Sequence, residues 1–154
     1  MNVTIIGAGN IGRGIGYRLV AGGHDVTDVD RDPEEAEQLI EELHGAAEGS
    51  ATVEVAGPGA ELRGEVVILA MYYPDSLEIA GELGDKLAGK VVVDIANPLN
   101  ETFDGFATAP GTSAAEEVAA SAPPGARVVK AFFTRAGVPP FGSWTASAWT
   151  SCWP

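Results

Sequence analysis

Short apolar runs alternate with amphipathic segments along most of this 154-residue chain. Runs rich in valine and isoleucine that end at glycine or at an acidic residue are typical of buried parallel strands. Such runs predict strands at residues 3–6, 25–29, 51–55, 65–71, 90–96 and 126–132. Strands that alternate with helices favour a parallel sheet covered on both faces, so we expect a doubly wound α/β domain.

Helical periodicity fills the intervals, at residues 10–23, 32–45, 74–89 and 112–122. The second segment carries the clearest signals, because Asp32 can cap its start, Glu35 completes a capping box and Gly45 stops it. Ser113 and Glu116 have the same spacing at the start of the last segment. In the third segment one helical face would carry Leu77, Ala80, Leu83 and Leu87.

The strongest motif is a glycine loop that follows the first strand and opens the first helix. It reads Gly7-Ala8-Gly9-Asn10-Ile11-Gly12. In a dinucleotide-binding (Rossmann) loop the first glycine permits a tight turn, the second lets a pyrophosphate approach the backbone, and the third lets the helix pack on the strand. The free amides and the helix dipole then favour phosphate.

The end of the second strand, Asp30-Arg31, lies where the adenosine ribose is read. A carboxylate at Asp30 accepts hydrogen bonds from ribose hydroxyls and repels a 2′-phosphate, which favours NAD. A guanidinium at Arg31 pairs with that phosphate, which favours NADP. These two residues alone leave the choice between NAD and NADP open.

Composition narrows the remaining classes of function. A formal net charge of -13 argues against binding to nucleic acid or to an anionic membrane. The single cysteine and the two histidines, without partners at ligand spacing, argue against a disulfide framework and a metal site. No apolar run reaches membrane-spanning length and no basic leader is present, so we expect a cytoplasmic protein.

Six stretches of the sequence together carry a similarity to one known family: "IIGAGNIG", "DRDPEEAEQL", "VVILAMYYPDSLEIA", "LAGKVVVDIANPLNETFDGF", "TSAAEEVA" and "ARVVKAF". Through about Phe132 the chain resembles the coenzyme F420-dependent NADP oxidoreductases. The resemblance implies an oxidoreductase that passes a hydride between NADP(H) and the deazaflavin F420. Such an enzyme supplies position and electrostatics rather than a catalytic acid or nucleophile, and we identify no catalytic residue.

Carried onto this chain, the resemblance assigns the pyrophosphate to Gly7, Gly9, Asn10, Ile11 and Gly12. Arg31 would meet the 2′-phosphate, although family members often carry a small polar residue where this chain has Asp30. We therefore expect NADP as coenzyme, with NAD as the alternative.

Two further segments should face the nicotinamide at the carboxyl ends of the strands. One follows the fourth strand and the other follows the fifth; their residues are Ala70, Met71, Tyr72, Tyr73, Asn97 and Pro98. Packing on the next helix is an alternative role for the two tyrosines, and an ordinary turn is one for Asn97-Pro98. Lys130 and Phe132 end the sixth strand, where the resemblance puts the edge of the deazaflavin. The alternative for Lys130 is a solvated charge at the end of a strand.

The last residues differ in composition from the rest of the chain. All three tryptophans lie there, and none of the 22 acidic residues lies beyond Glu117. Tryptophan has a single codon, so translation in a reading frame shifted by two bases must place Asp at the Trp149-Thr150 junction. The residues that this shifted frame allows around that Asp fit the segment "LDVLLA" of the resembling family. We expect a nucleotide-binding domain at 1–133 and an out-of-frame product at 134–154; a divergent terminus that packs its tryptophans on the sheet is the alternative.

The resembling family builds part of its deazaflavin pocket and of its subunit contacts after this point, so an out-of-frame tail would remove them. A homodimer would then require the full carboxyl-terminal part, and apolar sheet surface would be left uncovered. Small-molecule coenzymes are the expected partners. The alternatives to the F420-dependent enzyme are a nucleotide-binding module without turnover and another Rossmann dehydrogenase.

Overall fold

The computed structural model describes residues 1–45, 47, 50–102 and 104–132. The out-of-frame product expected at residues 134–154 therefore lies outside the described residues, and its origin stays a hypothesis. The described elements are β1 (Asn2–Ile6), α1 (Asn10–Ala21), β2 (Asp25–Val29), α2 (Pro33–His44), β3 (Val53–Ala56), β4 (Val66–Leu69), α3 (Tyr73–Leu83), the 3-10 helix η1 (Gly84–Leu87), β5 (Val91–Asp94), α4 (Ala114–Ser121) and β6 (Arg127–Lys130).

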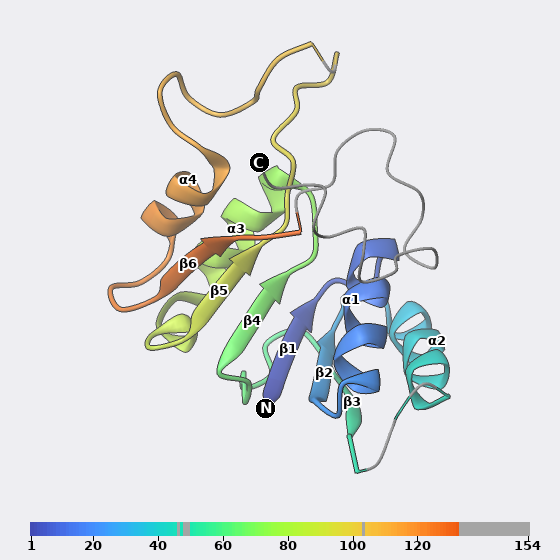
Figure 1. The fold of residues 1–154 in the computed structure, drawn as a ribbon. Helices are drawn as coiled ribbons and strands as arrows, with labels where there is room; N and C mark the ends of the chain where they lie inside the picture. The colour runs from blue at the N-terminus through green and yellow to red at the C-terminus, as the bar shows by residue number, and fades with distance from the viewer. Residues whose placement is uncertain (46, 48–49, 103, 133–154) are drawn as a thin grey trace, which may run out of the picture.

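The strands form one parallel sheet in the order β3-β2-β1-β4-β5-β6 (Figure 1). The chain moves outward from β1 to β3, then returns to the other side of β1 and moves outward again to β6. This arrangement confirms the predicted doubly wound α/β fold of the Rossmann type. The strand order reverses between β1 and β4, and ligands of such sheets bind outside the carboxyl ends of the strands at that point.

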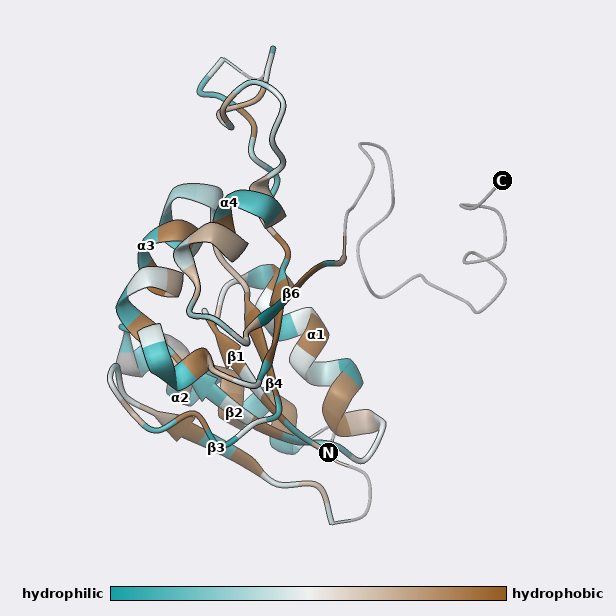
Figure 2. Ribbon diagram, turned by 90° about the vertical axis from the view of Figure 1, so that its left-hand side faces the viewer, coloured by the Kyte–Doolittle hydropathy of each residue, from teal (hydrophilic) through white to brown (hydrophobic). Residues whose placement is uncertain are grey.

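Each face of the sheet has its own hydrophobic core. On one face Ile15 and Val20 of α1 and Leu39 and Leu43 of α2 pack on strand residues such as Ile5. The opposite core joins β4 and β5 to the second group of helices through Val67, Leu69, Ala80, Leu87, Val92 and Val118. In Figure 2 the strands are mostly brown, while the helices show both brown and teal residues. Two cores therefore hold helices on both faces of the sheet.

The helix boundaries follow the predicted signals with one exception. Oδ1 of Asp32 accepts a hydrogen bond of 2.9 Å from the amide of Glu34 at the start of α2, and the predicted capping box of Ser113 and Glu116 is present. The expectation of a helical segment through residue 89 is wrong for its last turn. Gly84 has φ +46° and ends α3, after which η1 continues to the buried Leu87.

The outer strands leave apolar groups exposed on the face that carries α1. The parallel register places Val129 on the same side as Val66, a residue of the α1-side core. Val129 is 45% exposed, and Phe132, which follows β6, is 40% exposed. Within the described part of the chain, α4 packs on β5 and β6 from the opposite face only. The described residues thus leave apolar surface open beside β6.

The middle of β2 contains a buried carboxyl group. Asp28 lies between Ile5 and Val55 in the sheet, and its side chain has no solvent exposure. Neither of its oxygens has a hydrogen-bond partner among the described residues. Burial raises the pKa of Asp28 to about 7, and the negative charge of Asp30 adds to this effect. The carboxyl is therefore neutral in mildly acidic solution and destabilises the fold once it ionises.

Replacing Asp28 with valine should stabilise the protein more at pH 8 than at pH 5. Folding raises the pKa of Asp28 from 3.8 to about 7, so between these pH values the folded state binds more protons than the unfolded state. The stability of the wild-type protein therefore falls as pH rises through that interval. The advantage of Asp28→Val should be larger at pH 8 by on the order of 2 kcal/mol. Urea denaturation at both pH values measures it, and an advantage independent of pH would contradict the assignment.

Candidate functional site

The glycine loop joins the end of β1 to the start of α1. Gly7 has φ +110°, and its amide donates a hydrogen bond of 3.0 Å to the carbonyl oxygen of Val29 at the end of β2. Gly9 is the N-cap of α1, and its carbonyl accepts a bond of 2.9 Å from the amide of Arg13. The chain thus turns from strand to helix within three residues.

Close packing explains two of the three glycines. A Cβ atom on Gly7 would lie 2.7 Å from the carbonyl oxygen of Ala70. A Cβ atom on Gly12 would lie 2.1 Å from the carbonyl oxygen of Gly7 and 3.2 Å from the Cβ atom of Ala70. A Cβ atom on Gly9 would meet nothing within 4 Å among the described residues. Gly7 and Gly12 fix the fold of the loop, whereas Gly9 leaves space beside the backbone.

The first turn of α1 offers unpaired hydrogen-bond donors. No acceptor among the described residues pairs with the amides of Gly9, Asn10, Ile11 or Gly12. The first turn carries no acidic residue, and the positive end of the helix dipole lies at the same place. Orphan amides at a helix N-terminus are suited to phosphate oxygens. The side chains of Asn10 and Ile11 are exposed, so the first turn of α1 lies at the surface.

Asp30 is held against the glycine loop. Its Oδ2 accepts a hydrogen bond of 2.6 Å from the amide of Ala8, and its Oδ1 accepts one of 2.8 Å from the amide of Asp32. These two bonds fix the carboxylate between the loop and the start of α2. Arg31 is exposed at the same corner. A negative group and a positive group therefore both lie where a Rossmann fold binds the adenosine ribose of its coenzyme.

The segment after β4 divides into packed and exposed residues. The amide of Ala70 donates a hydrogen bond of 2.9 Å to Ile6, and Met71 packs against the α3-side core. Tyr72 is 82% exposed at the N-cap of α3. Tyr73 is buried between α3 and α4, where its hydroxyl donates a hydrogen bond to Glu117. The structure thus leaves Tyr72 at the surface, whereas Ala70 packs against the α1-side core and Tyr73 lies in a packing contact.

Two ionisable groups reinforce the contact between α3 and α4. Burial, and then the neighbouring Glu117, raise the pKa of Tyr73 to about 12. Hydrogen bonds from Thr112, Tyr73 and the amide of Ala109 lower the pKa of Glu117. Glu117 therefore stays charged and fastens the loop before α4 to the helices.

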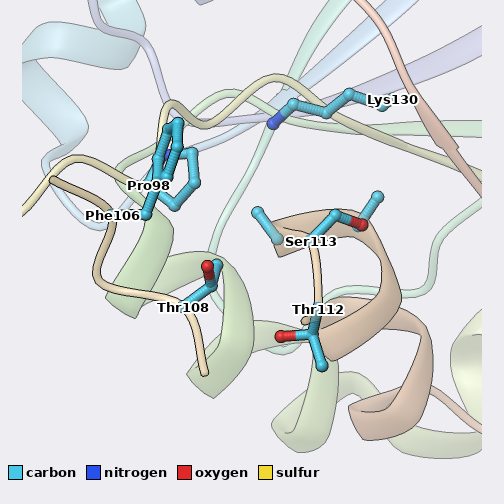
Figure 3. A pocket seen from close by; sticks show the side chains of 8 residues that line it. Pro98, Phe106, Thr108, Thr112, Ser113 and Lys130 are labelled. Carbon is cyan, nitrogen blue, oxygen red and sulfur yellow. The ribbon is translucent and has the colours of Figure 1, made fainter. Parts of the chain in front are cut away.

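A pocket of about 360 Å³ lies beside this loop at the carboxyl ends of the last two strands. Lys130 approaches from β6, Ser113 from the start of α4 and Phe106 from the connecting segment (Figure 3). Pro98 completes this side, and its carbonyl accepts a hydrogen bond of 2.8 Å from the amide of Ala107. Asn97 is exposed just before it. The pocket thus includes Pro98 and Lys130 from the sequence analysis.

Lys130 is not a solvated strand-end charge. Its Nζ lies 2.7 Å from Oδ2 of Asp94, whose side chain is fully buried, and it also donates a hydrogen bond to the carbonyl oxygen of Ala96. Oδ1 of Asp94 accepts a bond of 3.0 Å from the amide of Ala96. The ion pair therefore fixes the backbone from which Asn97 and Pro98 follow.

Sequence reasoning missed the two acidic residues inside the strands, Asp28 and Asp94. Each follows an apolar or β-branched run, and an acidic residue within a buried strand is a signal of a partner or an unusual pKa. No group of three or more potential metal-ligating side chains occurs in the part of the chain that the structure describes. In the same part, no helix is long and apolar enough to cross a membrane.

Comparisons with known proteins agree with this geometry. The family model described as "NADP oxidoreductase coenzyme F420-dependent" matches residues 2–98, which is more than half of the chain. A crystal structure of a candidate F420-dependent NADP reductase from Arthrobacter sp. FB24 is 29% identical, with a TM-score of 0.61. The match covers 83% of this chain and 60% of that one, so this chain spans only part of the length of that relative.

More distant structures share the fold alone. The imine reductase BcSIRED from Bacillus cereus BAG3X2 is 24% identical with a TM-score of 0.60, over 92% of this chain and 42% of that one. The prephenate dehydrogenase from A. aeolicus, solved with NAD+, is 19% identical with a TM-score of 0.62, over 90% and 43% of the two chains. The fold of this chain is thus shared with a reductase and a dehydrogenase of low sequence identity.

Substitutions at two glycines should separate folding from ligand binding. Gly12→Ala should destabilise the protein by about 2 kcal/mol or more, since its Cβ atom meets backbone at 2.1 Å. Gly9→Ala should change stability by less than about 1 kcal/mol and weaken binding of a nicotinamide dinucleotide about tenfold, because the methyl group fills open space at the phosphate approach.

Urea denaturation and calorimetric titration with NADP+ measure the two effects. Gly81→Ala is the control, because Gly81 is exposed within α3 and its Cβ atom would meet nothing within 4 Å. It should stabilise the helix by about 1 kcal/mol and leave binding unchanged. Full dinucleotide affinity in Gly9→Ala would contradict the assignment.

Proposed function

The chain belongs to the family of coenzyme F420-dependent NADP oxidoreductases, and on that premise we propose that it binds NADP(H) and exchanges a hydride with the deazaflavin F420. The residues that would hold the nicotinamide coenzyme follow β1, β2 and β4. The residues that would hold F420 follow β5 or lie at the end of β6. The reaction class is NAD(P)-dependent oxidoreduction.

The observation that carries the proposal is the set of orphan amides at the start of α1. The amides of residues 9–12 have no hydrogen-bond acceptor among the described residues, and the first turn of α1 carries no acidic residue. A Cβ atom on Gly9 would meet no described atom within 4 Å, so there is space beside its backbone. A diphosphate supplies the acceptors and the negative charge that this place lacks. The chain's own role at this point is to bind and orient the coenzyme.

The choice of nucleotide depends on the corner after β2. Arg31 is exposed and supplies a cation for a 2′-phosphate, so we assign NADP. Asp30 opposes this choice, because its carboxylate would repel a 2′-phosphate. Hydrogen bonds from the amides of Ala8 and Asp32 hold that carboxylate at the same corner. NAD is therefore the alternative coenzyme, and the two are distinguished by the role of Arg31.

The deazaflavin side uses the pocket lined by Pro98, Phe106 and Lys130. The two coenzymes would supply the chemistry when bound, because a hydride would pass directly between their rings. The protein contributes by holding the rings in contact and excluding water. Lys130 is already paired with Asp94, so its proposed role is to fix the floor of this pocket and not to exchange a proton.

A second candidate function is nucleotide binding without turnover. It is favoured by the apolar surface beside β6, because the described residues leave Val129 and Phe132 partly exposed. In that case the glycine loop would still bind a dinucleotide. Another Rossmann dehydrogenase activity has only the shared fold in its support.

The function is tested by mixing the full chain with NADPH and F420 and following the deazaflavin absorbance. The proposal expects a loss of that absorbance that depends on the protein, and a slower loss with Gly9→Ala because its coenzyme site is narrowed. Binding of NADPH without any absorbance change would favour the binding module. Failure of a folded chain to bind either nicotinamide coenzyme would contradict both candidates.

Replacing Arg31 with alanine tests the assignment of NADP. The substitution should weaken binding of NADP+ about tenfold and leave NAD+ binding nearly unchanged, because only NADP+ carries the 2′-phosphate. Calorimetric titration measures both affinities. Arg127→Ala is the matched control, since this arginine is exposed at the opposite end of the sheet's strands. Equal losses for NADP+ and NAD+ would refute a specific role for Arg31.

A further inference from the structure

We propose that Asp28 is a specificity-determining residue of the nucleotide site, whose ionisation disfavours the 2′-phosphate and so lowers the preference for NADP over NAD as pH rises. The inference rests on the nucleotide site proposed above. It adds a residue that lies beneath the site and need not touch the ligand.

The geometry links Asp28 to the ribose-reading corner. Asp28 and Asp30 are two residues apart along extended chain, which places their Cα atoms roughly 7 Å apart. Asp28 is fully buried and neither oxygen has a hydrogen-bond partner among the described residues. Asp30 is fixed by its bonds to the amides of Ala8 and Asp32. The two carboxyls therefore form a coupled pair, one buried and one beside the glycine loop.

The elements that surround Asp28 provide no described counterion. β1 has no titratable side chain, and Glu54 of β3 pairs with Thr27 in register, on the other face of the sheet, where it lies 3.8 Å from Arg63. From α1, Arg13 forms an ion pair of 2.5 Å with Glu42 of α2.

The other titratable groups give Asp28 no hydrogen bond, since neither of its oxygens has a partner among the described residues. Tyr17 of α1 is 49% exposed. The further titratable groups of α2 with described side chains are also exposed; they are Glu34, Glu37, Glu41 and His44. Within β2, Asp25 accepts hydrogen bonds from Thr52 at the far end of the strand. Asp30 is thus the charged group that acts on Asp28.

Proton binding follows from this arrangement. Burial and the charge of Asp30 hold the pKa of Asp28 at about 7. A doubly charged phosphate near Asp30 would add to the negative potential and favour the protonated form of Asp28 further. By linkage, each unit by which the phosphate raises that pKa weakens NADP binding tenfold at high pH. The ribose of NAD has no charge at this position, so NAD binding is affected less.

The test compares the affinities of NADP+ and NAD+ at pH 6 and pH 8.5 in the wild-type chain, in Asp28→Asn and in Asp25→Asn. Asp28→Asn keeps the shape of the side chain and removes its titration. Asp25→Asn makes the same change of charge at the other end of β2. The ionisation of the ligand's own phosphate is common to all three proteins, so it cancels in the comparison.

We expect the ratio of the NADP+ and NAD+ dissociation constants to rise about three- to tenfold more between the two pH values in wild type than in Asp28→Asn. Asp25→Asn should follow wild type. If both coenzymes bind and all three proteins share one pH profile, this inference is overturned while the proposed function stands. If neither coenzyme binds to folded protein, both are overturned.

A direct measurement covers the case in which Asp28→Asn does not fold. The carboxyl carbon signal of Asp28 in the wild-type chain reports its own titration by NMR. The midpoint should move to higher pH with NADP+ and move less with NAD+. Identical midpoints with the two coenzymes would overturn the inference.

Discussion

The contact between the start of α1 and the ends of β1 and β4 is the constraint on which the site depends. Gly7 and Gly12 have room for a hydrogen atom and not for a methyl group, because backbone atoms and Ala70 occupy that space. The tight contact aims the first amides of α1 at the carboxyl edge of the sheet. The strand order reverses between β1 and β4, so the loop, the segment after β4 and the segment after β5 all follow the carboxyl ends of strands, where ligands of such sheets bind.

The charges at the carboxyl ends of the strands differ between the two halves of the sheet. Near β2, the orphan amides and Arg31 favour phosphate while Asp30 and the buried Asp28 oppose additional negative charge. Near β5 and β6, the charge of Lys130 is neutralised by the buried Asp94. The pocket beside Lys130 is lined mainly by apolar atoms, including those of Pro98 and Phe106. A charged adenosine end and a less charged ring end are what a nicotinamide coenzyme and a flat partner ring require.

Much of the architecture could be predicted from the sequence, because strand runs and helix caps are local signals. The glycine loop was predictable for the same reason, and the expected capping box at Ser113 is present. The end of α3 was not, since a single glycine at Gly84 adopts a positive φ within an otherwise periodic segment. The roles of Tyr73 and Lys130 depended on Glu117 and Asp94, which are distant in sequence and become neighbours only in the folded chain.

The account depends on diphosphate binding by the amides of residues 9–12, and amide NMR tests it most directly. Titration of the labelled chain with NADP+ should move the signals of Gly9, Asn10, Ile11 and Gly12 downfield, as new hydrogen bonds form. Signals from the far ends of the strands, such as that of Asn2, should stay in place. Saturation with NADP+ that leaves the four loop amides unchanged would contradict the central claim.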